Sequence, residues 1–183
     1  MADVNLSTRM ASPDSRLAEP RAPAAREADL RWDIIELLFF AYRDFTAEPD
    51  AILARYDFGR AHHRVIHFVG RHPRMTVGEL LAILRITKQS LNRVLGQLVR
   101  QGFVDQHPGQ RDRRQRLLEL TLKGRELERQ LSAPQHARIA NAYRQAGTQA
   151  VEGFREVLLG IIADEEDRCR FEPAAPPEHI MST

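Results

Sequence analysis

Between Thr76 and Leu98 the apolar positions recur every three or four residues, in two successive runs. The first run opens with Thr76 and Glu79, which have the spacing of a capping box and predict the start of a helix. After a short connection, Thr87 can cap a second helix. The apolar stripes are Val77, Leu80, Leu81 and Leu84, and then Leu91, Val94, Leu95 and Leu98. The pattern predicts a helix-turn-helix.

The opposite face of the second predicted helix is polar. Gln89, Asn92, Arg93 and Gly96 project from it. Amide and guanidinium groups can pair with base edges in a major groove, and a glycine lets the backbone approach closely. The candidate DNA contacts of this helix are Thr87, Lys88, Gln89, Ser90, Asn92 and Arg93.

A hairpin with a basic loop is predicted next. Gly102 suits the left-handed position past a helix end, strand residues begin at Phe103–Asp105, and a second strand follows at Leu117–Leu120. The connecting segment HPGQRDRRQR holds four arginines against one aspartate, with Pro108 and Gly109 as turn residues. A long basic hairpin beside a helix-turn-helix is typical of a winged helix, whose wing would reach the neighbouring minor groove or the backbone.

The wing sequence resembles a known family. Asp112-Arg113-Arg114, followed by Leu120-Thr121 and Gly124, is similar to the wing signature of MarR-type transcriptional regulators. The resemblance implies that Asp112 orients Arg114, whose guanidinium enters the minor groove. The family often has a further acidic residue three positions before that aspartate, where this chain has Gly109, so the resemblance supplies no brace for Arg111. The candidate wing contacts are Arg111, Asp112, Arg113, Arg114 and Arg116. The specific motif covers residues 103–124 and the general pattern residues 30–168.

Two further helices have more apolar surface than one small domain needs. Leu30–Phe45 is apolar nearly all round, and Val151–Ile162 has a clean apolar stripe with few neighbours to cover it. We therefore expect these helices to pair across a two-fold axis in a homodimer. The alternative is that Leu30–Phe45 is only the central core helix. Pro49 is expected to break the chain and leave Ala51–Tyr56 as a short separate helix.

The fold class expected is mainly α with a small β-hairpin: a winged helix-turn-helix domain with N- and C-terminal dimerisation helices. A helix is expected over Gly59–Gly70, another from Thr121 to about Ser132, and a further stretch that Pro134 begins or kinks. The expected organisation is 1–28 as a disordered arm, 29–71 as N-terminal dimerisation helices, 72–124 as the winged helix-turn-helix, 125–170 as the C-terminal dimerisation helices, and 171–183 as a disordered tail.

Charge is unevenly distributed. Residues 85–116 hold eight basic and two acidic residues, a net charge of +6, against +2 for the whole chain, so the remainder carries −4. A locally positive surface on an otherwise acidic chain is typical of nucleic-acid binders, although a solvated charged face has the same composition.

The remaining composition narrows the class of protein. The single cysteine, Cys169, excludes an internal disulfide, and its acidic neighbours favour an ordinary thiol over a redox sensor. The longest apolar run, Leu37–Tyr42, is far too short to span a bilayer, and no signal peptide is visible, so we expect a cytoplasmic protein without a membrane partner.

Histidines cluster at His62, His63, His67 and His72. His63 and His67 have the spacing that metals use on a helix, but no Glu-rich or Cys partner accompanies them, so capping, packing or pocket lining is the favoured reading. No phosphate-binding glycine loop, nucleophile elbow, zinc-protease motif or cysteine pair occurs. The chain is not expected to be an enzyme or to carry a cofactor.

The resemblance implies a regulator, most often a repressor, that binds a pseudo-palindromic site in double-stranded DNA as a homodimer. Many members are released by small aromatic acids or by oxidation, from a pocket between the dimerisation helices and the winged helix. The residues implied for a pocket holding a small aromatic or anionic effector are Phe40, Arg43, Tyr56, His63 and His67. The alternative is a winged helix used as a protein-interaction module. The polar recognition face and the four wing arginines favour DNA.

Overall fold

The structure is a computed structural model that describes residues 32–110 and 112–171. The expected N-terminal arm, Arg111 and all but the first residue of the expected tail lie outside the described residues. The chain divides into two compact units, Met1–Leu38 and Phe39–Thr183. The first helix begins in one unit and continues into the other.

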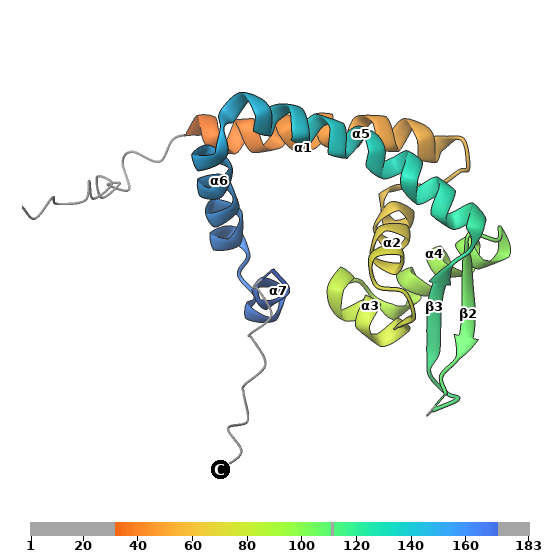
Figure 1. Ribbon diagram of the computed structural model, residues 1–183. Coiled ribbons are helices and arrows are strands. Elements are labelled where there is room, and N and C mark those ends of the chain that lie inside the picture. Colours follow the sequence, from red (N-terminus) through yellow and green to blue (C-terminus); the bar gives the residue numbers. More distant parts are fainter. Residues whose placement is uncertain (1–31, 111, 172–183) are drawn as a thin grey trace, which may run out of the picture. The chain divides into compact units, whose positions relative to one another are not determined.

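The described residues confirm a mainly helical fold with one small sheet (Figure 1). The helices are α1 (Trp32–Ala54), α2 (Arg60–Arg71), α3 (Val77–Leu84), α4 (Lys88–Arg100), α5 (Leu122–Ala146), α6 (Thr148–Ile161) and α7 (Glu165–Cys169). The strands are β1 (Met75–Thr76), β2 (Val104–Pro108) and β3 (Arg116–Leu120).

Local capping sets the helix-turn-helix as the sequence predicts. The Glu79 amide donates to Thr76 Oγ1 at 3.1 Å, and the Thr76 amide donates to the Glu79 carboxylate at 2.6 Å. The bond from the Thr76 amide is the main cause that lowers the pKa of Glu79. Arg85 takes a left-handed conformation at the end of α3, and Thr87 then caps α4 through the Ser90 amide at 3.2 Å. These contacts fix where both helices begin.

The sheet has one strand more than the predicted hairpin. Strands β2 and β3 pair antiparallel from Val104–Leu120 to Pro108–Arg116, and β1 covers the other edge of β3 through Met75–Leu118. Because β1 is only two residues long, it carries no alternating pattern that sequence reasoning could detect. It forms because β3 has a free edge beside the start of α3.

The junction between wing and α5 depends on a glycine. A Cβ at Gly124 would lie 2.0 Å from the carbonyl oxygen of Phe103, so only glycine lets α5 begin this close to β2. Thr121 fixes the same junction, because its hydroxyl donates to the Gly102 carbonyl at 2.7 Å and accepts from the Gly124 amide at 3.0 Å. Two of the motif positions that resemble the family signature therefore have a structural role.

One hydrophobic core joins the end of α1 to α2, α3, α4, the sheet and the first half of α5. Its fully buried side chains include Leu53, Val65, Ile66, Leu80, Leu91, Leu98, Phe103, Leu118, Leu127 and Leu131. Both apolar stripes of the predicted helix-turn-helix contribute to it. The winged helix is thus built on a continuous apolar base that also holds α2 and α5.

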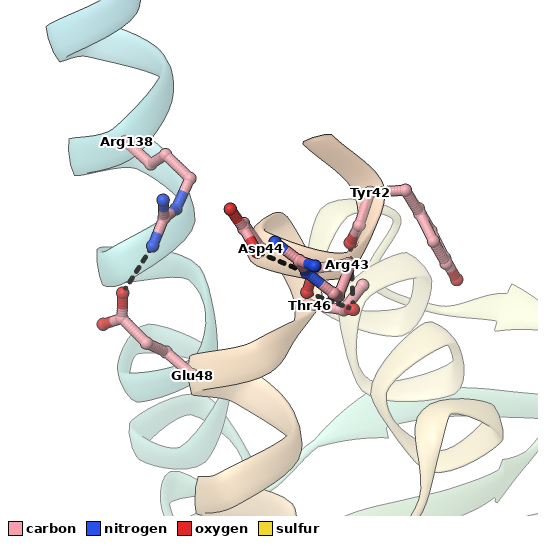
Figure 2. A network of polar contacts seen from close by, with 6 residues as sticks. All are labelled: Tyr42, Arg43, Asp44, Thr46, Glu48 and Arg138. Carbon is pink, nitrogen blue, oxygen red and sulfur yellow. Dashed lines mark hydrogen bonds and ion pairs between the residues drawn. The ribbon is translucent and has the colours of Figure 1, made fainter. Parts of the chain in front are cut away.

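The expected break at Pro49 is wrong, because α1 continues through it to Ala54. Proline has no N–H, which leaves the carbonyl of Phe45 without its helical donor. The side-chain amide of Gln135, on α5, donates to that carbonyl at 3.4 Å. Next to it, Arg138 of α5 reaches Glu48 of α1 at 3.0 Å (Figure 2). Contacts with α5 therefore support α1 as a continuous helix where its own sequence would end it.

The expectation that one helix ends near Ser132 and that Pro134 begins another is also wrong, because α5 continues through Pro134 to Ala146. A second difference is α7, an unpredicted short helix that follows α6 and is capped by Asp164. Its acidic first turn favours a helix start.

Much of the apolar surface of α1 and α6 is uncovered in the single chain. Helix α6 has no buried residue, and its apolar stripe is exposed. On α1 the described residues before Thr46 are all exposed or half-buried. The exposed large apolar side chains of these helices are Trp32, Ile34, Ile35, Leu37, Leu38, Phe39, Phe40, Tyr42, Phe154, Val157, Leu158 and Ile161. The first half of α1 is therefore not a central core helix of this chain.

Candidate nucleic-acid interface

Helix α4 presents one polar face to solvent. Gln89, Ser90, Asn92 and Arg93 are exposed, as are Thr87 and Lys88 at its start, while the four leucine and valine positions of its stripe are buried. Gly96 is half-buried, and a Cβ there would lie 3.2 Å from the Arg100 guanidinium. The face proposed from the sequence is thus the free face of the helix.

A cleft of about 510 Å³ joins this face to the wing. Its lining combines the start of α3, the exposed side of α4 and the base of the wing. The lining residues are Thr76, Val77, Gly78, Leu81, Lys88, Asn92, Leu95, Gln106, Arg114, Gln115 and Arg116. Residues that the sequence suggested separately, on helix and wing, therefore lie around one concave surface.

Sequence reasoning missed three polar residues of this cleft. Thr76 was read only as a helix cap, and Gln106 and Gln115 carry no charge that would single them out. The register of β2 against β3 places Gln106 opposite Leu118. Strand alternation from a known register could have found Gln106, but the register itself comes from the structure.

At the wing tip, Asp112 contacts the backbone of Arg114. Its carboxylate accepts the Arg114 N–H at 2.9 Å, and its carbonyl accepts the Gln115 N–H at 3.1 Å. The loop closes where the Gly109 N–H donates to the Gln115 carbonyl at 3.0 Å. The resemblance implied a contact with the side chain of Arg114. The observed bond instead shapes the turn from which that side chain projects.

Gly109 occupies the position where the family often has an acidic residue. A Cβ at this glycine would lie 2.6 Å from the carbonyl oxygen of Asp112. No side chain fits without moving the backbone of the tip. The tight turn thus accounts for the departure from the family pattern in physical terms.

The cations on α4 and the wing have no acidic partner among residues 32–110 and 112–171. In the described part of the chain, no salt bridge involves Lys88, Arg93, Arg113, Arg114 or Arg116. All five side chains belong to exposed residues. Cations without carboxylate partners beside a helix N-terminus create a positive potential suited to phosphates.

Arg85 differs from these cations. Its guanidinium lies 2.5 Å from the Asp164 carboxylate and 3.1 Å from that of Asp167, near α7. The bond from Arg85 is the main cause that lowers the pKa of Asp164. Arg85 belongs to the segment that is positively charged in the sequence. In the structure its charge is compensated by two aspartates from the C-terminal region.

A second cavity, of about 450 Å³, lies against α2. Its lining mixes aromatic rings with cationic and amide groups. The lining residues are Tyr42, Phe45, Thr46, Arg60, His63, Arg64, His67, Phe68 and Gln135. Burial is the main cause that lowers the pKa of His63 and of His67, so both rings are neutral at pH 7. Among the described residues no cluster of three His, Cys, Asp or Glu side chains could hold a metal ion.

The five residues suggested for an effector pocket are divided by the structure. His63 and His67 line the cavity. Phe40 and Arg43 lie on α1 outside its lining, with the Arg43 guanidinium 4.9 Å from the centre of the Phe40 ring. Tyr56 packs edge-on against Phe103 in the core, at 5.4 Å between ring centres.

Comparison with known proteins identifies the family. The MarR family model matches residues 56–115. The HTH-type transcriptional regulator PetP from Rhodobacter capsulatus is 58% identical over 124 residues, which cover 68% of this chain and 75% of PetP. The chain belongs to the MarR family. It is a transcriptional regulator of MarR type.

Solved structures with low sequence identity have the same fold. FabT from Streptococcus pneumoniae, solved in complex with DNA, superposes with a TM-score of 0.64 at 22% identity, over 74% of this chain and 96% of FabT. A mutant of E. coli MarR complexed with operator DNA gives a TM-score of 0.56 at 20% identity, over 72% of this chain and 94% of that one. These similarities support the winged-helix fold. Within the described residues, no helix is both long and apolar enough to cross a membrane.

Proposed function

We propose that this MarR-family regulator binds double-stranded DNA, with the exposed face of α4 in the major groove and the wing tip in the adjacent minor groove. The observation that carries the proposal is the cleft that unites Lys88 and Asn92 of α4 with Arg114 and Arg116 of the wing. Its unpaired cations suit phosphates, and the amide and guanidinium groups of α4 suit base edges. FabT and E. coli MarR, which share the fold, are both solved with DNA.

The proposed binding unit is a homodimer. The uncovered apolar faces of α1 and α6 support it, because exposed apolar patches of this extent typically mark interaction sites. A two-fold dimer presents two copies of α4, so its operator is a pseudo-palindrome with half-sites about one helical turn apart. Repression is the proposed outcome, since an operator-bound dimer excludes other proteins from the same DNA.

Selection of duplexes from a random pool by the full-length protein tests DNA binding directly. We expect enrichment of a two-fold symmetric sequence, bound with an affinity that falls steeply with salt. Replacing Arg116 by Ala should reduce the salt slope by about one and weaken all duplexes similarly. The matched control is Arg144→Ala, an exposed arginine of α5 outside the cleft. If no duplex sequence is enriched, the winged helix is better explained as a protein-interaction module.

The cavity against α2 is the proposed site of a small aromatic carboxylate. Tyr42, Phe45 and Phe68 offer aromatic walls, and Arg60 and Arg64 offer the cations that a carboxylate needs. Arg60 already pairs with Asp50 at 2.9 Å, whereas Arg64 forms no salt bridge with any residue that the structure describes.

Benzoate is a suitable probe for this cavity. Calorimetry should detect its binding to the wild-type protein and weaker binding to Arg64→Gln. Arg71→Gln, on the same helix but outside this lining, is the matched control. Equal benzoate affinity in both variants would contradict the site.

A further inference from the structure

His62 of α2 forms hydrogen bonds through both ring nitrogens, and the bond at Nε2 links α2 to α4. Its Nδ1 accepts the backbone N–H of Gly59 at 3.0 Å, and its Nε2 lies 3.1 Å from Oε1 of Gln97 on α4. Because Nδ1 acts as the acceptor, the proton of the neutral ring lies on Nε2 and is donated to Gln97. The two bonds therefore require one tautomer.

The other groups around the ring hold it in this orientation. The side-chain amide of Gln97 donates to the Asp57 carbonyl at 3.2 Å, so both ends of that amide are bonded. The Phe58 ring stacks on His62 at 4.6 Å between centres and 9° between planes. Phe58 in turn packs edge-on against the buried Phe103. The imidazole is thus fixed by the turn before α2, by α4 and by the core.

Gln97 stands one helical turn after Arg93, a proposed base-reading residue. Hydrogen bonds to base edges weaken steeply when the angle departs from linear, so a small rotation of α4 about its axis removes them. The hydrophobic effect is non-directional, so apolar packing restrains such a rotation only through shape, whereas a hydrogen bond also restrains the angle. A polar bond on the flank of α4 supplies that directional restraint.

We propose that His62 is a positioning residue of DNA recognition, which sets the rotation of α4 through Gln97 and does so only as the neutral ring. The inference rests on the proposed DNA-binding function. By this inference α2 influences which bases α4 recognises, although α2 itself does not contact the DNA.

Protonation would break the arrangement for two reasons. A protonated ring has no lone pair on Nδ1, so it cannot accept the Gly59 N–H; its Nε2–H can still donate to Gln97, but the bond that orients the ring is lost. It would also place a positive charge near Arg93 of α4, with Asp57 of the preceding turn as the opposing acidic group. Burial is the main cause that lowers the pKa of His62, which keeps the ring neutral near pH 7.

Two substitutions of His62, to Asn and to Gln, test its two hydrogen bonds one at a time. An Asn side chain places an oxygen near the position of Nδ1 and keeps the Gly59 bond, whereas a Gln side chain places its amide near Nε2 and keeps the Gln97 bond. The probe is the duplex that the wild-type protein selects from a random pool, with a scrambled duplex for comparison. The readout is the ratio of the two affinities at pH 7.5.

We expect His62→Asn and Gln97→Leu each to reduce this ratio by about fivefold to tenfold, the equivalent of one ordinary hydrogen bond. The double variant should lose no more than the larger single loss, because both act through one bond. His62→Gln, which keeps the bond to Gln97 but lacks the Gly59 bond that orients the ring, should restore part of the ratio. Ser132→Ala, which removes the 2.7 Å bond to Glu128 on α5, is the control for a loss that acts only through stability.

The pH dependence gives a second readout. Between pH 8 and pH 6.5 the ratio should stay level for the wild-type protein, and from pH 6.5 to pH 5 it should fall, because the pKa of His62 is lowered from 6.5; for His62→Gln it should stay level over the whole range. Unchanged ratios in His62→Asn and Gln97→Leu, or a ratio in His62→Gln as low as in His62→Asn, would overturn the inference. A pool without any enriched duplex would instead overturn the proposed DNA binding, so the two failures are distinguishable.

Discussion

At the wing tip, one carboxylate and one glycine shape the backbone from which Arg114 projects. Asp112 accepts the Arg114 N–H, and Gly109 leaves room for the Asp112 carbonyl. A long arginine on a loop has many rotamers, and ordering it costs entropy. A preformed turn reduces that cost by fixing where the side chain begins.

Arg114→Ala is therefore expected to weaken operator binding strongly, and Asp112→Ala to weaken it by about 1 kcal/mol through the loss of one bond. The second effect opposes simple electrostatics, since removing a negative charge near DNA should by itself help. Asp112→Asn, which keeps an acceptor oxygen, should bind at least as well as the wild type. A double-mutant cycle of Asp112 and Arg114 should be non-additive. If Asp112→Ala tightened binding, Asp112 would be only a repulsive charge.

Substitution of two glycines should separate an effect on stability from an effect on DNA binding. Gly124→Ala should lower the free energy of unfolding by about 1–3 kcal/mol, because its Cβ meets the Phe103 carbonyl in the core junction. Gly109→Ala should leave thermal unfolding almost unchanged and reduce operator affinity, because its clash is confined to the wing tip. Thermal melts and DNA titrations of both variants test this. Equal destabilisation of the two would contradict it.

Among the elements, α4 combines a buried stripe with a polar face that no other described element covers. Replacing Gln89 or Arg93 by Ala is expected to relax sequence preference at particular base pairs, by about 1–3 kcal/mol each. Affinities for a panel of single-base operator variants measure this. A uniform loss across the panel would identify these side chains as phosphate contacts.

Helix α2 carries three histidines whose pKa is lowered mainly by burial: His62, His63 and His67. Their ordinary value is 6.5, so the unfolded chain takes up protons below that pH before the folded chain does. The contribution of these histidines to the free energy of unfolding is therefore fully present above pH 6.5. It is lost as the pH falls toward their lowered pKa values. Urea unfolding from pH 8 to pH 5 should show this decline, and His63→Gln should reduce it. A pH-independent midpoint would contradict the assignment.

For the whole molecule, the core ends at α5, and α6 contributes nothing buried to it. We expect Val157→Glu or Ile161→Glu to yield monomers that keep the winged-helix core folded, because a charge in an apolar interface is costly. Sedimentation equilibrium and circular dichroism measure the two properties. Glu152→Lys, on the polar side of α6, should stay dimeric. A monomeric wild-type protein would exclude the dimer.

The sequence alone determined the parts of this protein that depend on neighbours along the chain. Capping by Thr76 and Thr87, the buried stripe of α4 and the basic wing follow from residues a few positions apart, so periodicity and composition predict them. The wing signature was likewise enough to indicate the family, which the comparison with PetP confirms.

Only the tertiary structure decided the features that depend on partners distant in sequence. Helix α1 passes Pro49 because Gln135 bonds the free carbonyl of Phe45, and β1 exists because β3 offers it an edge. Similarly, the contact of His62 with Gln97 requires α2 to lie against α4. Local propensity is weak compared with packing and hydrogen bonding to distant groups, and the positions of such groups are set only when the chain has folded.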